Sequence, residues 1–330
     1  MDWQGRRVLV TGAGGFIGSH LVEALAGRGV RVRALVRYNS ASARGWLDEL
    51  PASLLPQVEV VAGDIRDGGG VQAAVSGQEV VFHLAALVSI PYSYEAPESY
   101  IDTNVRGTLN VLEACRRAGG VRLVQTSTSE VYGTPETVPI TEAHPLRAQS
   151  PYAATKVAGD KLAESYHCSF GLPVVVLRPF NTYGPRQSAR AVLPTILSQL
   201  LAGRTTIELG ALWPRRDLMY VTDAVAGFVK AAESEAAVGQ TVHLGTGRDV
   251  SVGELAELAM TVTGKRAEIV SKAERERPAD SEVRQLLSSP AAAQRLLGWT
   301  PTVPLEEGVR LTADWVRRNL SSFDVGAYRR

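Results

Sequence analysis

Cysteine is scarce in this chain, and no metal-binding pattern accompanies it. Only Cys115 and Cys168 occur in 330 residues, and neither belongs to a C-x-x-C pair. A disulfide framework is therefore excluded, and we expect no zinc site or other metal site.

Excess charge and long apolar runs are also missing. The formal net charge is +1, so no global basic field favours nucleic acid or a membrane surface as a partner. No apolar signal segment precedes the first strand-like run, and no stretch of about 18 apolar residues occurs. We expect a cytoplasmic protein that binds any anionic ligand through a few local groups.

What is present is a regular alternation of strand-like and helix-like segments over the first 180 residues. The strand-like runs are continuous in Val, Leu and Phe, as strands covered on both faces require. This rhythm predicts an α/β fold, a doubly wound, Rossmann-like parallel sheet. The expected strands are Arg7–Val10, Val32–Val36, Val58–Ala62, Val80–Ala85, Arg122–Ser127 and Val174–Arg178, with helices near 15–27, 70–77, 97–118 and 150–169.

The rhythm weakens after Arg178, where prolines punctuate shorter helices and a charge-rich stretch at 272–280. We therefore expect a dinucleotide-binding domain over 1–180. Residues 181–330 are expected to form mainly a smaller C-terminal α/β substrate lobe, discontinuous, with some segments returning to the first domain.

A glycine-rich loop, T-G-A-G-G-F-I-G at 11–18, joins the first expected strand to the first helix. Glycines let backbone amides approach a pyrophosphate, which then lies at the helix N-terminus. In a strand–loop–helix context this pattern predicts dinucleotide binding. The loop residues assigned to the cofactor are Gly12, Gly15, Phe16, Ile17 and Gly18.

The end of the second strand bears on the choice between NAD and NADP. An acidic residue there accepts from the ribose 2′-hydroxyl, whereas an arginine accommodates a 2′-phosphate. The chain reads A-L-V-R-Y-N-S at 34–40, so Arg37 favours NADP while NAD stays open. The other residues assigned to the cofactor are Asn39, Ser40, Asp64 and Ile65, with Leu84, Ala85 and Ala86 after the fourth strand.

The segment S-P-Y-A-A-T-K at 150–156 predicts a helix start, with Ser150 as N-cap and Pro151 at the first position. Tyr152 and Lys156 then share one face, a turn apart. A lysine ammonium and a positive nicotinamide ring beside the phenol would lower its pKa from about 10 and make it a base.

These residues together resemble the extended short-chain dehydrogenase/reductases, in the nucleotide-sugar epimerase and dehydratase branch, over essentially the whole chain. The matching stretches are T-G-A-G-G-F-I-G, G-D-I-R at 63–66, H-L-A-A at 83–86, D-T-N-V-R-G-T at 102–108, T-S-T-S-E-V-Y-G at 126–133, Y-A-A-T-K, R-P-F-N-T-Y-G-P at 178–185 and R-R-D-L-M-Y-V-T-D at 215–223. The resemblance implies a tightly bound, recycled NADP or NAD and a sugar nucleotide as substrate.

The resemblance also implies catalytic roles. The hydroxyl of Thr128 bonds the substrate and the phenol, Tyr152 deprotonates a sugar hydroxyl, and Lys156 holds the nicotinamide ribose. In the 4,6-dehydratases a glutamate at the position of Glu130 removes the C5 proton, after which water leaves C6. A surface turn is the simpler interpretation of Glu130.

Three reactions stay open at this stage. Ser129 stands where glucose-type dehydratases carry an aspartate, which leaves the proton donor for C6 open, and Thr-Ser-Glu resembles the GDP-mannose and legionaminic-acid-pathway 4,6-dehydratases. UDP-glucuronate decarboxylases share Thr-Ser-Glu, and 4-epimerases need no such glutamate. We expect the dehydratase reaction first, and a purely binding role is disfavoured because Thr128, Glu130, Tyr152 and Lys156 are all present.

The substrate diphosphate requires local donors on a chain of almost no net charge. Guanidinium groups suit phosphate, and the substrate-binding residues assigned here are Ser129, Asn181, Arg190, Arg216 and Arg277. His83 and Trp213 are expected to be packing residues. By analogy with relatives, the helices at 97–118 and 150–169 predict a homodimer.

Overall fold

A parallel sheet forms the centre of the molecule in the computed structural model, which describes residues 2–323 and 325. Its seven strands have the order β10-β6-β5-β4-β1-β2-β3, and every neighbouring pair is parallel. The strands are β1 (Arg7–Thr11), β2 (Arg31–Arg37), β3 (Val58–Gly63), β4 (Val80–His83), β5 (Arg122–Thr126), β6 (Val174–Pro179) and β10 (Thr241–Leu244). The apolar runs form strands because both faces of the sheet are covered.

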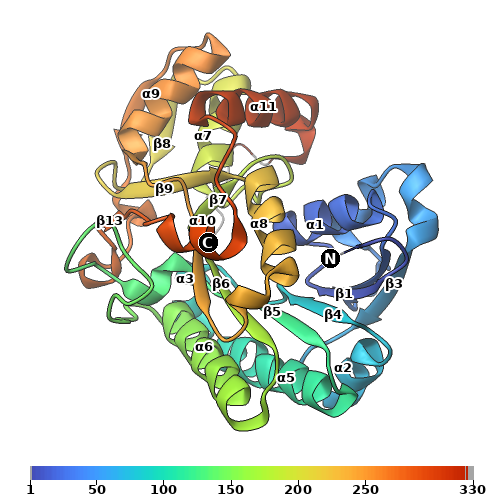
Figure 1. Ribbon diagram of the computed structural model, residues 1–330. Coiled ribbons are helices and arrows are strands. Elements are labelled where there is room, and N and C mark those ends of the chain that lie inside the picture. Colours follow the sequence, from blue (N-terminus) through green and yellow to red (C-terminus); the bar gives the residue numbers. More distant parts are fainter. Residues whose placement is uncertain (1, 324, 326–330) are drawn as a thin grey trace.

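Helices lie on both faces of this sheet (Figure 1). On one face α1 (Phe16–Ala26) and α8 (Val221–Glu233) pack together over the strands. On the other face lie α2 (Gly68–Val75), α5 (Gly107–Ala118) and α6 (Pro151–Phe170). This arrangement confirms the predicted doubly wound, Rossmann-like fold.

Most expected elements differ from the observed ones by one or two residues at an end, and two of the differences bear on the site. The fourth strand ends at His83 rather than Ala85, because the backbone N–H groups of Leu84 and Ala85 donate to the Thr11 hydroxyl. The single helix expected over 97–118 consists of α4 (Pro97–Tyr100), a π-helical turn η3 (Ile101–Arg106) and α5. Such single π turns are often found at functional sites.

The start of α6 follows the prediction. The Ser150 hydroxyl accepts from the backbone N–H of Ala153, and Pro151 takes the first helical position. Gly171 ends the helix in the left-handed conformation. Tyr152 and Lys156 therefore lie in the first turns of a well-defined helix.

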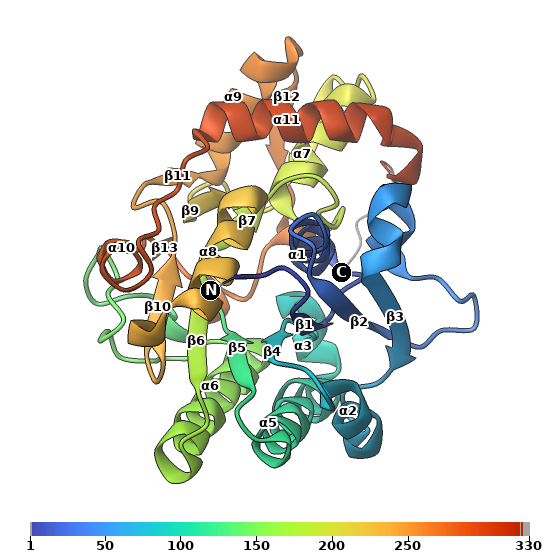
Figure 2. The same ribbon diagram turned by 45° about the vertical axis from the view of Figure 1, so that its right-hand side comes forward.

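A smaller lobe stands above the carboxyl ends of the central strands (Figure 2). Its core is a group of three mutually packed helices, α7 (Val192–Leu201), α9 (Val252–Thr263) and α11 (Leu305–Arg318). The short strands here are β7 (Asn181–Tyr183), β8 (Thr206–Leu209), β9 (Arg215–Tyr220), β11 (Asp249–Ser251), β12 (Glu268–Ser271) and β13 (Gln285–Leu286). They pair in two small groups, β11-β9-β13 with β7 on β9, and β12-β8.

Segments after residue 181 also contribute to the central sheet. Strand β10 pairs with β6, and α10 (Ala291–Leu297) packs on α8 and β10. The division into 1–180 and 181–330 stays a prediction.

The remaining turns of helix are short. They are α3 (Ile90–Glu95), η1 (Gly45–Glu49), η2 (Ala52–Gln57), η4 (Ser129–Tyr132), η5 (Glu235–Ala237), η6 (Ala273–Arg275), η7 (Ala279–Ser281) and η8 (Leu320–Ser322). Among the described helices, none has the length and apolar character that crossing a membrane requires.

Candidate active site

The glycine loop between β1 and α1 packs directly against the chain that follows β4. Gly12 has φ of 68°, and a Cβ there would lie 2.8 Å from the backbone nitrogen of Ala85. A Cβ on Gly18 would lie 2.2 Å from the Gly12 carbonyl oxygen. Both positions therefore require glycine.

The N-terminus of α1 suits an anion. Its N-cap is Gly15, and no side chain caps the first turn, so Phe16 and Ile17 begin a helix whose first N–H groups have no intrahelical acceptor. These groups and the helix dipole form a site of the kind that binds a pyrophosphate. The loop therefore fits the dinucleotide that the sequence predicts.

At the end of β2, Arg37 and Ser40 are exposed, whereas Asn39 organises its own loop. The Asn39 amide donates to the carbonyls of Arg37 and Ala43 and accepts from the N–H of Ala43. Among these three predicted cofactor residues, Arg37 is therefore the one that exposes a positive charge at the end of β2.

At the end of β3, Asp64 is paired with its neighbour. The Arg66 guanidinium donates to both oxygens of Asp64, and this contact holds the pKa of that carboxyl below its usual range, with the charge of Arg37 contributing. Ile65 is buried, and a Cβ on Gly107 would lie 2.5 Å from its Cδ1. Ile65 thus packs α5 against this strand end.

A buried polar network fixes the segment after β4. His83 Nδ1 lies 2.8 Å from the Thr11 hydroxyl, and Nε2 lies 3.2 Å from the Thr108 hydroxyl. Burial first, and then the charge of Lys156, lower the pKa of His83 to about 3, so its imidazole is neutral. His83 is a hydrogen-bonded core residue, as expected.

Asn104 holds the next residues of the same segment. Its amide accepts from the Leu87 N–H at 2.8 Å and donates to the Leu87 carbonyl at 3.0 Å. The π-helical turn carries Asn104, so this irregular helix holds Leu87, the residue directly after the predicted cofactor segment Leu84–Ala86. Sequence reasoning noted D-T-N-V-R-G-T without assigning this residue a role.

The catalytic candidates meet where β5 and α6 come together. Thr128 caps the η4 turn, accepting from the Glu130 N–H at 3.3 Å, and its side chain is hydrogen-bonded to the Tyr152 phenol. Lys156 Nζ donates to the Thr126 carbonyl. Tyr152 and Lys156 are both buried.

The electrostatics of the phenol differ from the expectation. Burial raises the pKa of Tyr152, the Thr128 hydrogen bond lowers it, and the charges that act on the phenol, from Glu130, Tyr100 and Asp160, all raise it. The Lys156 ammonium is turned toward Thr126 and has its own pKa lowered by burial to about 8. The side chains of the protein by themselves therefore raise the pKa of the phenol, whereas the predicted lowering includes the charge of a nicotinamide ring and stays a prediction.

Glu130 lies close enough to the Tyr152 phenol for its charge to raise the pKa of the phenol, and it begins a chain of alternating charges. Its carboxylate is 3.9 Å from Arg277 Nη1, which is 3.4 Å from Glu282, and Glu282 accepts from Arg216 at 2.9 Å. The Glu130 side chain is 12% exposed. Glu130 is therefore an inward-facing carboxylate beside the phenol, which disagrees with a simple surface turn.

Arg216 and Arg277, the two arginines in this series of charges, differ in how many protein contacts hold them. Arg216 also donates to the carbonyls of Arg215 and Val283, so it is fixed by protein contacts. Arg277 has only the two longer contacts with Glu130 and Glu282 among the described residues. Arg277 thus keeps donors for a ligand, whereas Arg216 is largely engaged.

The other residues predicted to bind the substrate, Asn181, Arg190 and Ser129, differ in their burial. The Oδ1 atom of Asn181, in β7, is buried without a hydrogen-bond partner in the described chain. Arg190 is exposed, and its charge acts on Tyr100, whose ring is 6.3 Å from that of Tyr152. Ser129 is buried, and Trp213, expected to pack, is 54% exposed because its loop between β8 and β9 leaves the ring uncovered.

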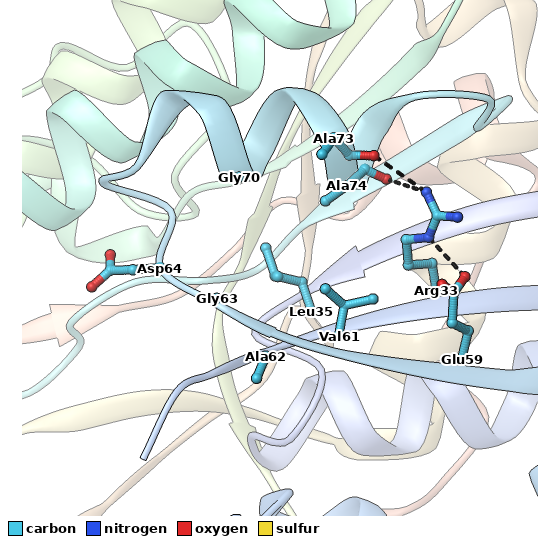
Figure 3. Close-up of a pocket in the computed structure, with 10 residues that line it drawn as sticks. All are labelled: Arg33, Leu35, Glu59, Val61, Ala62, Gly63, Asp64, Gly70, Ala73 and Ala74. Carbon is cyan, nitrogen blue, oxygen red and sulfur yellow. Dashed lines mark hydrogen bonds and ion pairs between the residues drawn. The ribbon is translucent and has the colours of Figure 1, made fainter. Parts of the chain in front are cut away.

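A separate pocket lies between α2 and the strands β2 and β3 (Figure 3). Arg33 closes one end by donating to Glu59 and to the carbonyl of Ala74. Of the predicted site residues, only Asp64 lines it. This pocket is therefore distinct from the site around Tyr152.

Known proteins are similar over almost the whole chain. The sequence profile of the GDP-mannose 4,6 dehydratase family matches residues 9–312. A dTDP-glucose 4,6-dehydratase of Streptomyces griseus is 36% identical over 95% of this chain and 95% of its own length. A UDP-glucose 4-epimerase of Mycolicibacterium smegmatis is 38% identical over 94% and 98%, respectively.

The solved structures agree with this similarity. The UDP-glucose 4-epimerase of Thermus thermophilus in complex with NAD superimposes with a TM-score of 0.83 at 34% identity. The match covers 94% of this chain and 99% of the epimerase. Dehydratases and epimerases are thus similar to this chain to a comparable degree.

Proposed function

The chain belongs to the GDP-mannose 4,6-dehydratase family of nucleotide-sugar enzymes, and from that premise we propose that it is a nucleotide-sugar 4,6-dehydratase with NADP or NAD as cofactor. The observation that carries the proposal is Glu130. An inward-facing carboxylate beside Thr128 and Tyr152 is what deprotonation at C5 requires, and a 4-epimerase has no step that uses it.

The residues divide the work as follows. Tyr152 would take the proton of the C4 hydroxyl once the positive charge of a bound nicotinamide ring lowers the pKa of its phenol, and Thr128 would hold that hydroxyl and the phenol together. When bound, the nicotinamide ring supplies the site that takes the C4 hydrogen as hydride and returns it at C6. The new ketone would acidify C5, and Glu130 would remove the C5 proton and pass it to the C6 hydroxyl, which then leaves as water. The proton that Tyr152 takes from the C4 hydroxyl balances the one that C5 regains when the hydride returns to C6.

The cofactor would be held by residues of the first half of the chain. The glycine loop would bind the pyrophosphate, Lys156 the nicotinamide ribose, and Arg37 the adenosine ribose. Because Arg37 is exposed and no carboxylate ends β2, we propose a preference for NADP. NAD is the alternative, since the Thermus thermophilus relative is bound to it.

The substrate would bind with its diphosphate toward Arg277, with Asn181, Arg190 and Arg216 around it. A fork of guanidinium donors matches phosphate oxygens. The sugar would then extend from Arg277 toward Glu130, because the two side chains are neighbours.

By analogy with relatives, we also propose a cytoplasmic homodimer that pairs through η3, α5 and α6. The apolar side chains of Ile101 and Leu109 are exposed on η3 and α5. Burial of such side chains stabilises a dimer.

A panel of UDP-, dTDP-, GDP- and CDP-hexoses, together with UDP-glucuronate, tests the reaction. Loss of one water from the product mass means dehydration, and loss of carbon dioxide means decarboxylation. An unchanged mass with an altered NMR spectrum means epimerisation. Turnover of UDP-glucuronate alone would refute the dehydratase proposal in favour of the decarboxylase.

Replacement of Glu130 by Gln tests whether Glu130 is the base that removes the C5 proton. Oxidation at C4 should remain, seen as transient absorbance of reduced cofactor, while elimination slows by about 10²–10⁴-fold because the base is lost. Glu136→Gln, an exposed glutamate six residues on, is the matched control and should keep both steps. Product formation by Glu130→Gln at the wild-type rate would exclude Glu130 as the base.

A further inference from the structure

A buried ion pair lies beneath the candidate active site. Asp160, on α6, is fully buried, and its Oδ2 accepts from Arg178 Nη2 at 2.8 Å and from Arg178 Nε at 3.0 Å. The Ser127 hydroxyl donates to the same oxygen at 2.8 Å. Asp160 thus joins three elements, α6, β6 and the end of β5.

Ser127, which is hydrogen-bonded to this ion pair, connects the pair to the residues that contact Lys156 and Tyr152. Ser127 stands between Thr126, whose carbonyl accepts from Lys156, and Thr128, which is bonded to Tyr152. The pair therefore holds the backbone that orients both the lysine and the phenol.

Arg178 extends the same contacts to the η4 turn. Its Nη1 donates to the Tyr132 hydroxyl at 2.6 Å, and Tyr132 ends the turn that carries Glu130. The guanidinium carbon also lies 5.1 Å from the centre of the Tyr132 ring. The position of Glu130 thus depends on the same ion pair.

A contribution to the stability of the fold does not explain why the charged side chains of Asp160 and Arg178 are buried here. Desolvating two ions is costly, and apolar residues of similar volume are often as stable in such places. The Oδ1 atom of Asp160 is buried and has no hydrogen-bond partner among the described residues, which adds to that cost. Asp160 is also one helical turn beyond Lys156, on the same side of α6.

We propose that Asp160 is a positioning residue of the active site, which through Ser127 and Arg178 sets the geometry of Thr128, Glu130 and Lys156 and faces Lys156 with a negative charge. The inference rests on the proposed function for the roles of Tyr152 and Lys156. It does not depend on which reaction follows C4 oxidation.

The electrostatics agree with this role. Burial lowers the pKa of Lys156, and the charge of Asp160 raises it again, leaving a value of about 8. The titratable or charged groups on the elements packed around Lys156 are His83 on β4, Arg178 on β6, Glu130 and Tyr132 on η4, Tyr92, Tyr94 and Glu95 on α3, Glu98 and Tyr100 on α4, Asp102 and Arg106 on η3, Glu113, Cys115, Arg116 and Arg117 on α5, and Tyr152, Asp160, Lys161, Glu164, Tyr166, His167 and Cys168 on α6 itself. Among them, Asp160 is the group whose charge opposes the loss of the lysine proton.

The test compares Asp160→Asn with the wild-type holoenzyme. The variant should oxidise a sugar nucleotide about 10²-fold more slowly, because displaced catalytic groups lose that much. The Lys156 ammonium should be lost at a lower pH without the Asp160 charge, so the alkaline limb of the oxidation rate should move to lower pH. Bound cofactor should also leave the protein faster on dialysis, a readout that needs no turnover.

Two controls separate positioning from general damage. Asp160→Glu, which keeps the charge, should restore the pH profile in part. Asp223→Asn removes another buried carboxylate, one bonded to Thr302 and to the N–H of Val303, and should leave the pH profile unchanged. An Asp160→Asn enzyme with the wild-type rate and pH profile would overturn the proposal.

Ser127→Ala decides the question if Asp160→Asn does not fold. This variant keeps the Asp160–Arg178 ion pair but loses the hydrogen bond from Ser127, at the end of β5, to Asp160. C4 oxidation should therefore slow, and cofactor release should become faster. Unchanged oxidation and release would refute the positioning role. Because these readouts concern the first step, failure of the Glu130→Gln test would count against the dehydratase alone.

Discussion

The two sides of the candidate site are built differently. On the side of β5 and α6, Tyr152 and Lys156 are buried and hydrogen-bonded to Thr128 and Thr126. On the side contributed after residue 181, Arg190 is exposed and Arg277 is 27% exposed. Within residues 2–323 and 325, the contacts of Arg277 are long ones to the carboxylates of Glu130 and Glu282.

We interpret this difference as a division of roles, in which the buried side carries out the reaction and the more exposed side binds the substrate. Groups fixed in a low-dielectric interior act strongly on a reacting centre and need no rearrangement when it reacts. Long, partly solvated arginines adapt to a ligand and lose side-chain entropy when they bind it. Changes on the buried side should therefore alter rate constants, and changes on the other side should alter affinity.

The largest effect is expected from Tyr152→Phe. The phenol is the proposed base for the C4 hydroxyl, so C4 oxidation should fall by about 10²–10⁴-fold while the sugar nucleotide still binds. Stopped-flow absorbance of reduced cofactor measures the step. Tyr166→Phe, on the same helix and bonded to Glu113, is the control and should oxidise normally. A fully active Tyr152→Phe enzyme would contradict the assignment of the buried side to chemistry.

A smaller effect, on affinity, is expected from Arg277→Gln. Loss of a charged hydrogen bond to the diphosphate costs about 1.5–3 kcal/mol, so KM should rise by about 10- to 100-fold with little change in the oxidation rate at saturation. Steady-state kinetics over a range of substrate concentrations separate the two constants. The control is Arg266→Gln, an exposed arginine paired with Glu257. If the oxidation rate at saturation fell and KM did not change, the two sides would not differ as described.

The smallest effect concerns the cofactor. Arg37→Gln should lower the preference for NADP over NAD by roughly fivefold, as one exposed charge contact of about 1 kcal/mol implies. Calorimetric titration of both cofactors measures it. Arg31→Gln, at the other end of β2 and also exposed, should change neither affinity. Tighter binding of NAD by the unaltered protein would contradict the assignment of Arg37 to a 2′-phosphate.

Local patterns in the sequence predicted much of the central domain. The Val-rich runs, the glycine loop and the Ser150-Pro151 helix start each depend on residues within a few positions of one another. The sequence did not predict the π-helical turn at Ile101–Arg106, whose Asn104 is hydrogen-bonded to the distant Leu87. Trp213 was misplaced because exposure depends on which loops cover a side chain.

The sequence by itself determined the order of strands and helices, the dinucleotide loop and the helical spacing of Tyr152 and Lys156. These follow from periodicity and from the conformational limits of glycine and proline, which act over a few residues. Tertiary structure decided which charges meet: Asp160 with Arg178, Glu130 with Arg277, and Arg216 with Glu282. It also buried the Tyr152 phenol, and this burial raises the pKa of the phenol because the desolvation of a side chain depends on all the segments packed around it.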